Sequence, residues 1–231
     1  MQRRYHDRKE AGQALAKDLG SAGILGNAVV VALPRGGVPV GVEVARSLAA
    51  PLDIVTVKKI GAPAQSELAC GAVAVDGSIV WNDPLLYSLG ITQAELSRAK
   101  ERALQEARKL DQALRSPSAP ALSVYAKTAI VVDDGLATGA TMKAALKAIL
   151  LQKPQRVLVA VPVGPDDTCK EIEAMGYTVV CPLRVPEGEL LSVGEWYDDF
   201  SQVESGDCRD MLEESRGHPG GPRPLEPHAV H

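Results

Sequence analysis

The chain has 231 residues, of which 45% are hydrophobic and 23% are charged, so it is long enough for one domain with a continuous core. Its net charge of −4 argues against a nucleic-acid binder that depends on a basic surface. The polar N-terminus does not resemble a signal peptide, and no apolar run is long enough to span a membrane. We therefore expect a cytoplasmic protein with neither a nucleic-acid nor a membrane partner. The scattered cysteines predict no zinc site and no disulfide framework: Cys70, Cys169, Cys181 and Cys208.

Helical and strand patterns alternate along most of the chain, and this order predicts right-handed crossovers in a parallel sheet. We expect an α/β fold with a five-stranded, mostly parallel sheet flanked by helices. The arginines of the helix at 92–115 are more typical of a solvated face than of a binding surface. Helices are predicted at 7–22, 38–50, 92–115, 139–150, 166–175 and 202–216, strands at 28–33, 52–57, 130–132, 156–161 and 178–181, and a hairpin at 72–81.

The most informative segment spans residues 130–141, with the sequence IVVDDGLATGAT. Its apolar run predicts a strand covered on both faces, and Asp133 and Asp134 follow at the carboxyl end, where open α/β sheets bind ligands. The next residues, 137–141, have little side-chain bulk, and a helix begins within them. Backbone N–H groups and the positive end of the helix dipole can therefore bind an anion there. An anion site beside two acids suits a sugar phosphate with vicinal hydroxyls.

This segment resembles the signature of the type I phosphoribosyltransferases, which use 5-phosphoribosyl-1-pyrophosphate (PRPP). An apolar strand, two acids, two variable residues and Ala-Thr-Gly-x-Thr are all present, whereas the competing interpretation is a generic strand-to-helix turn. The resemblance covers about residues 5–215 and implies one domain over residues 1–216, with a small hood contributed by about 186–200. The remaining segment, 217–231, is rich in proline and glycine, and we expect it to be disordered.

Two further segments match the resemblance. Leu33-Pro34-Arg35-Gly36-Gly37 directly follows a parallel strand, so we expect it at the same sheet edge as Asp133. The family has its pyrophosphate loop at this position; the alternative is a tight turn with an exposed arginine. Lys58 and Lys59 end the next predicted strand and point to opposite faces, and we expect Lys59 to face the site and Lys58 to be solvated.

Two other segments leave alternatives open. Residues 66–72 resemble the mobile catalytic loop of these enzymes, or form an ordinary connection. Trp196 and Tyr197 are candidates for stacking on the accepting base, whereas hydrophobic anchoring of a C-terminal flap is the alternative, which is favoured for Phe200.

The resemblance implies a glycosyltransferase of the pentosyltransferase type that uses PRPP and Mg²⁺. It would transfer the 5-phosphoribosyl group to a nitrogenous base or related heterocycle and release pyrophosphate, as in nucleotide salvage. The alternative is a non-catalytic regulatory protein that binds PRPP or a nucleotide. Ala137 stands where 6-oxopurine enzymes carry an aspartate, so adenine-like or other heteroaromatic amines rank above hypoxanthine and guanine. The acceptor, and whether the chain forms a homodimer, stay open.

The resemblance assigns catalysis to Asp133, Asp134, Arg35 and Lys59. It assigns Mg²⁺ binding, through water, to the two aspartates. The expected PRPP-binding residues are Arg35, Gly36, Gly37, Lys58, Lys59, Asp133, Asp134, Ala137, Thr138, Gly139, Ala140 and Thr141.

Overall fold

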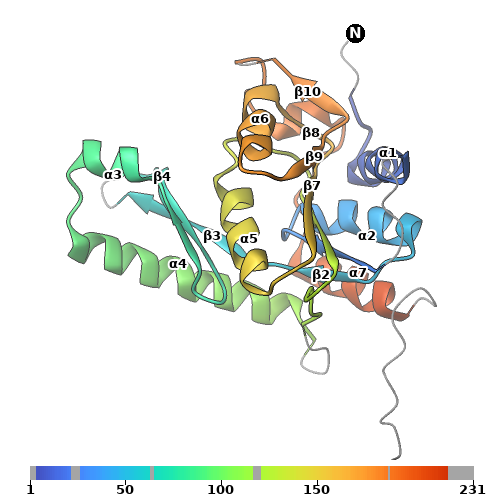
Figure 1. Cartoon of the computed structure of the whole chain (residues 1–231), viewed down its shortest axis with the longest axis horizontal. Helices are drawn as coiled ribbons and strands as arrows, with labels where there is room; N and C mark the ends of the chain where they lie inside the picture. Colours follow the sequence, from blue (N-terminus) through green and yellow to red (C-terminus); the bar gives the residue numbers. More distant parts are fainter. Residues whose placement is uncertain (1–3, 22–26, 63–64, 117–120, 187, 218–231) are drawn as a thin grey trace, which may run out of the picture.

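A five-stranded parallel sheet forms the centre of the protein, and helices flank it, which confirms the predicted fold (Figure 1). The structure is a computed structural model that describes residues 4–21, 27–62, 65–116, 121–186 and 188–217. The strand order is β2-β1-β6-β7-β9, and every neighbouring pair is parallel. The strands are β1 (Ala28–Ala32), β2 (Leu52–Ile54), β6 (Thr128–Val132), β7 (Arg156–Ala160) and β9 (Thr178–Val180).

Two hydrophobic clusters hold the layers together, because successive side chains of a strand point to opposite faces of the sheet. On one face, Val31 and Val131 pack with apolar side chains of helices α5 and α6. On the other face, Val30 and Ile130 pack with apolar side chains of α1, α2 and α7. These helices are α1 (Arg8–Ser21), α2 (Gly37–Leu48), α5 (Ala140–Leu151), α6 (Asp166–Ala174) and α7 (Ser205–Gly217).

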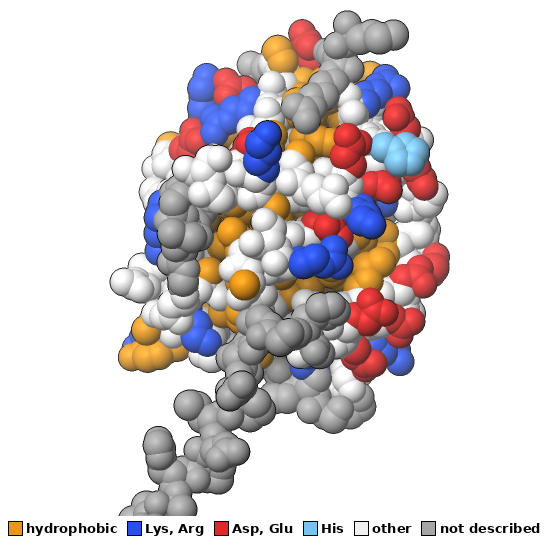
Figure 2. All heavy atoms as spheres, turned by 90° about the vertical axis from the view of Figure 1, so that its right-hand side faces the viewer, with side chains coloured by type: hydrophobic (Ala, Val, Ile, Leu, Met, Phe, Trp, Pro, Cys, Tyr) orange, Lys and Arg blue, Asp and Glu red, His pale blue; other side chains and the backbone are white. Residues whose placement is uncertain are grey.

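The face of the molecule that carries α1 and α2 is shown in Figure 2. Basic and acidic side chains are interspersed on it around a strip of apolar side chains. Among the described residues visible on this face, the basic side chains are separated by acidic and apolar ones.

A three-stranded antiparallel sheet and two helices form an arm that projects from the central sheet (Figure 1). The predicted hairpin is present: β4 and β5 pair across a turn in which Gly77 has a φ of +91°. A capping box of Thr92 and Glu95 starts the long helix. The arm consists of β3 (Val57–Ala62), β4 (Gln65–Ala74), β5 (Ile79–Trp81), α3 (Asp83–Leu89) and α4 (Gln93–Leu114).

The arm corrects two predictions. The strand predicted at 52–57 ends at Ile54, since Thr56 accepts a backbone hydrogen bond from Val75 of the hairpin (3.0 Å) and the chain turns into β3. Lys58 and Lys59 therefore lie within an antiparallel strand and not at the end of a parallel one. Residues 66–72 belong to β4, which pairs with β3, so this segment is part of a strand and not a loop.

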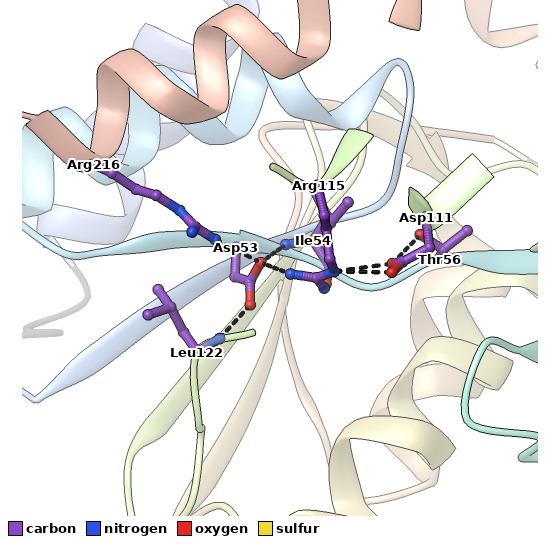
Figure 3. Close-up of polar contacts among 7 residues, drawn as sticks. All are labelled: Asp53, Ile54, Thr56, Asp111, Arg115, Leu122 and Arg216. Atoms are coloured by element: carbon purple, nitrogen blue, oxygen red, sulfur yellow. Dashed lines mark hydrogen bonds and ion pairs between the residues drawn. The ribbon is translucent and has the colours of Figure 1, made fainter. Parts of the chain in front are cut away.

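Charged side chains join the arm and α7 to strand β2 (Figure 3). The Asp53 carboxylate is 4% exposed and lies 2.5 Å from Nη1 of Arg115, while the Leu122 N–H donates to its other oxygen (2.6 Å). Arg115 also binds Asp111, and Arg216 of α7 lies 3.6 Å from Asp53. Arg115, expected on a solvated face, is thus largely buried and anchors the end of α4.

A small second region covers the central sheet near β9. It contains the two-stranded parallel sheet of β8 (Val163–Pro165) and β10 (Leu183–Val185), together with the 3-10 helix η1 (Val193–Trp196). The N-terminal segment joins it, because Tyr5 donates a backbone hydrogen bond to Trp196 (2.9 Å) and accepts one from Asp198 (2.8 Å). The region expected to form the hood, about 186–200, therefore packs with the N-terminal segment of the described chain. The tail expected to be disordered lies outside the described residues, apart from Gly217 at the end of α7.

None of the helices in the described ranges combines the length and apolar character that a membrane crossing requires.

Candidate active site

Two loops meet at the carboxyl edge of the central sheet: residues 34–37 after β1 and residues 133–139 after β6. The Gly36 and Gly37 backbones lie directly against the acids. A Cβ atom added to Gly36 would be 2.0 Å from Oδ2 of Asp134, and one added to Gly37 would be 3.0 Å from Cα of Asp133. Only a residue without a side chain allows this approach. The structure therefore brings together the two segments that the sequence placed at one edge.

The two carboxyl groups of Asp133 and Asp134 are close neighbours in a largely buried position. The backbone N–H of Asp134 donates to Oδ1 of Asp133 (2.9 Å). Burial raises the pKa of Asp133 well above its ordinary value, and the charge of Asp134 raises that pKa further. Burial also raises the pKa of Asp134, whereas Arg8 acts in the opposite direction. The pair thus resists carrying two negative charges, and a bound cation would relieve this repulsion.

The loop of small residues leads from these acids into α5. Gly139 has a φ of +72°, which disfavours any side chain, and no side chain caps the N-terminus of this helix. Ala137, Thr138 and Thr141 are exposed, and the Thr168 hydroxyl donates to the Ala137 carbonyl (3.2 Å), which ties the loop to α6. Within the described residues, no side-chain cap is present at the first N–H groups of α5, and these groups can bind an anion.

The candidate cations lie in two different settings. Arg35 is half-buried in the loop after β1, and its Nη1 atom lies 3.6 Å from a carboxylate oxygen of Glu204. In β3, Lys58 is half-buried and Lys59 is exposed. Adjacent residues of a strand point to opposite faces, as we expected for this pair. The roles of all three cations toward a ligand stay predictions.

The candidate stacking residues are packed into the protein. Trp196 is 8% exposed and Tyr197 is 4% exposed, and both belong to a cluster with Tyr5, Val163 and Val185. Almost no ring surface is left for a base, so this burial favours the anchoring alternative for these two residues.

Tyr197 contacts the acid pair instead. Its hydroxyl donates to the backbone carbonyl of Asp134 (2.5 Å). Burial raises the pKa of this hydroxyl, with the Asp134 charge acting in the same direction, so the proton stays in place.

Sequence reasoning missed Arg8, the first residue of α1. Its Nε atom lies 2.8 Å from Oδ2 of Asp134, and the two side chains are 12% and 14% exposed. Nothing in the sequence marks this pair, because a single arginine at a helix start is common and its partner is 126 positions away.

Comparisons with known proteins identify the family of the chain. The model of the phosphoribosyl transferase domain matches residues 2–189. "Putative phosphoribosyl transferase" proteins from two strains of Mycobacterium tuberculosis, CDC 1551 and H37Rv, are each 39% identical over 210 residues, which cover 90% of this chain and 46% of theirs. The chain thus spans about half the length of these curated relatives.

A solved structure is also similar over most of its length. The crystal structure of TT1426 from Thermus thermophilus has 39% sequence identity and a TM-score of 0.77, with 91% of this chain and 98% of that chain covered. Together with the family model that matches most of the sequence, these relatives show that the chain belongs to the phosphoribosyl transferase family.

Proposed function

We propose that this protein binds PRPP at the edge formed by the loops 34–37 and 133–141 and transfers its phosphoribosyl group to a nitrogen heterocycle. The observation that carries the proposal is the contact of the Gly36–Gly37 backbone with Asp133 and Asp134. It supports one binding site in which a pyrophosphate loop lies beside acids that can accept hydrogen bonds from ribose hydroxyls. The family membership of the chain supports the same reaction.

The uncapped N-terminus of α5 supports the proposed position of the 5′-phosphate. Its N–H groups and the hydroxyls of Thr138 and Thr141 are donors, while the positive end of the helix dipole favours an anion. Arg35, Lys58 and Lys59 are the proposed partners of the pyrophosphate. As in the sequence-based prediction, Lys59 is preferred over Lys58.

The acid pair fits Mg²⁺, since carboxylates are the hard oxygen ligands this ion prefers. Among the described residues, no group of three His, Cys, Asp or Glu side chains could hold a metal. As the family resemblance implies, Asp133 and Asp134 would hold the ion through water, with substrate oxygens completing its shell. When bound, Mg²⁺ would neutralise the leaving pyrophosphate.

The proposed reaction needs no protein nucleophile. The acceptor nitrogen forms a bond to C1 of the ribose as the C1–O bond to pyrophosphate breaks, and the electron pair leaves with the pyrophosphate oxygen. The chain contributes position and charge: carboxylates beside the electron-poor ribose, and cations beside the leaving group. Ala137 leaves no carboxylate at the position that the 6-oxopurine enzymes use, so we propose adenine-like or other heteroaromatic amines as acceptors.

A titration with PRPP and Mg²⁺, followed by a pyrophosphate-release assay with a panel of bases and a cell extract, tests the proposal. We expect PRPP binding, pyrophosphate release, and an acceptor whose mass increases by one phosphoribosyl group. Asp134→Asn should lower turnover at least about tenfold, or about 1.4 kcal/mol. Asp18→Asn, which removes an exposed carboxylate on α1, is the matched control.

The outcomes separate the candidate functions. Absence of PRPP binding by the wild-type protein would refute the proposal. Unchanged binding and turnover when both Asp133 and Asp134 are replaced by asparagine would refute the site. Binding without pyrophosphate release, across the whole panel and the extract, would favour the regulatory alternative. Hypoxanthine or guanine as the best acceptor would contradict the argument from Ala137.

A further inference from the structure

Arg8 connects the N-terminal helix to the acid pair across the sheet edge. Its Nε atom donates to Oδ2 of Asp134 at 2.8 Å. Both side chains are largely buried, at 12% and 14% exposure, so water competes weakly for this contact. A charge-assisted hydrogen bond in such a setting is stronger and more directional than an exposed ion pair.

Two further contacts fix the guanidinium of Arg8. Nη1 donates to the backbone carbonyl of Ser201 (2.8 Å), and Cζ lies 3.9 Å from the centroid of the Phe200 ring. The guanidinium is therefore held at Nε by Asp134, at Nη1 by Ser201 and on one face of its plane by the Phe200 ring. A side chain fixed in this way can determine the orientation of the carboxylate that it binds.

Asp134 is confined from the opposite side. Gly36 lies against the same carboxylate oxygen that Arg8 binds, and the backbone carbonyl of Asp134 accepts from Tyr197. Oδ2 is thus held between Arg8 and the Gly36 backbone, which fixes the orientation of the whole carboxylate. The positive charge of Arg8 also offsets the negative charge of one of the two adjacent carboxylates. This matters because an anionic sugar phosphate would have to bind beside them.

We propose that Arg8 is a positioning residue that orients Asp134 for the ribose hydroxyls of PRPP and offsets its charge. This inference rests on the proposed function. It assigns to Phe200 and Ser201 the role of holding Arg8, and it makes the N-terminal segment part of the PRPP site. Arg8 itself touches no reacting atom.

A double-mutant cycle between Arg8 and Asp134 tests this role, with Arg8→Met, Asp134→Asn and the double variant. The readouts are the PRPP dissociation constant in the presence of Mg²⁺, kcat and KM for PRPP, and the thermal midpoint. Arg8→Met retains most of the apolar stem and removes the charge. Lys9→Met, at the neighbouring exposed position of α1, removes the same charge without a buried partner.

We expect Arg8→Met to weaken PRPP binding about tenfold or more, because a charge-assisted contact is lost. In the Asp134→Asn background the same change should cost at most about threefold, since its partner carboxylate is already absent. Arg8→Lys should recover part of the affinity, because it restores a cation but not the planar fork. Lys9→Met should bind PRPP like the wild type.

Losses that multiply in the double variant would overturn the inference, because they would mean that Arg8 only anchors the chain ends. Wild-type affinity in a folded Arg8→Met protein would also overturn it. If Arg8→Met does not fold, the cycle with Arg8→Lys decides on the same criterion. A wild-type protein that binds no PRPP would instead refute the proposed function, and the inference with it, so the two failures are distinguishable.

Discussion

Replacing Gly36 by alanine tests the geometry of the acid pair most directly. Gly36 has φ −60° and ψ −34°, which alanine adopts without strain, so the added methyl group is the only perturbation. That methyl carbon would lie 2.0 Å from Oδ2 of Asp134, which is 1.4 Å less than the 3.4 Å at which ordinary contact begins. Asp134 must therefore move by about the length of a covalent bond, and its 2.8 Å contact with Arg8 cannot survive such a shift.

The magnitude follows from two effects. Overpacking costs about 1–3 kcal/mol, and the loss of a hydrogen bond to a charged group costs about 1.5–3 kcal/mol. Because the shift that relieves the overlap is also the one that breaks the bond, we expect these costs to overlap, giving about 3 kcal/mol in the free energy of unfolding. We also expect at least a tenfold loss of PRPP affinity, about 1.4 kcal/mol.

Urea denaturation and calorimetric titration with PRPP and Mg²⁺ measure the two effects of Gly36→Ala. Gly20→Ala is the matched control, because no atom of the described residues outside the glycine's neighbours and its own helix backbone lies within 4 Å of the Cβ position at this helical glycine. It should leave PRPP affinity unchanged and stabilise α1 slightly. A Gly36→Ala protein with wild-type stability and wild-type PRPP affinity would refute the reasoning.

Three further substitutions test other parts of the structure. The raised pKa of Asp133 means that folding favours its protonated form, so the ionised carboxylate destabilises the protein as pH rises from its unfolded pKa near 3.8 through its folded pKa. Asp133→Asn should therefore raise the thermal midpoint more at pH 8 than at pH 4. An equal increase at both pH values would contradict this. Arg115→Met should lower the free energy of unfolding in urea by about 3 kcal/mol, because it removes the closest cation from the buried Asp53. Lys170→Met, which breaks an exposed ion pair with Asp166, is the control and should change that free energy little. Gly139→Ala should weaken phosphate binding in a titration, since alanine disfavours a φ of +72°; unchanged binding would argue against the anion site at α5.

Local patterns were sufficient to predict the central sheet and the elements beside the candidate site. The apolar run before Asp133 lacks polar alternation because β6 is covered on both faces, so its position could be read from a few neighbouring residues. The capping box at Thr92 and Glu95 is a local signal of the same kind. Gly36 and Asp133 could be assigned to one edge because parallel strands end together there.

Long-range pairing could not be predicted in the same way. Arg115 was expected in solvent because α4 is rich in arginine, and only the fold brings it to Asp53, 62 positions away. The pair of Arg8 and Asp134 has the same origin. In both cases the role of the arginine depends on a carboxylate from another element. Which carboxylate that is cannot be read from a single sequence.

The aromatic segment shows why the acceptor is the least predictable part of the site. A cluster of rings in an aromatic-poor chain indicates packing as readily as binding, and the two are distinguished only by which ring faces solvent. Trp196 and Tyr197 are buried, whereas Phe200 is 37% exposed and lies under the guanidinium of Arg8. Among the three rings of this segment, Phe200 therefore has the most exposed surface, and it is also the ring that contacts Arg8. An acceptor that used this surface would contact the element that fixes Asp134, so acceptor recognition and PRPP binding would be coupled through Phe200.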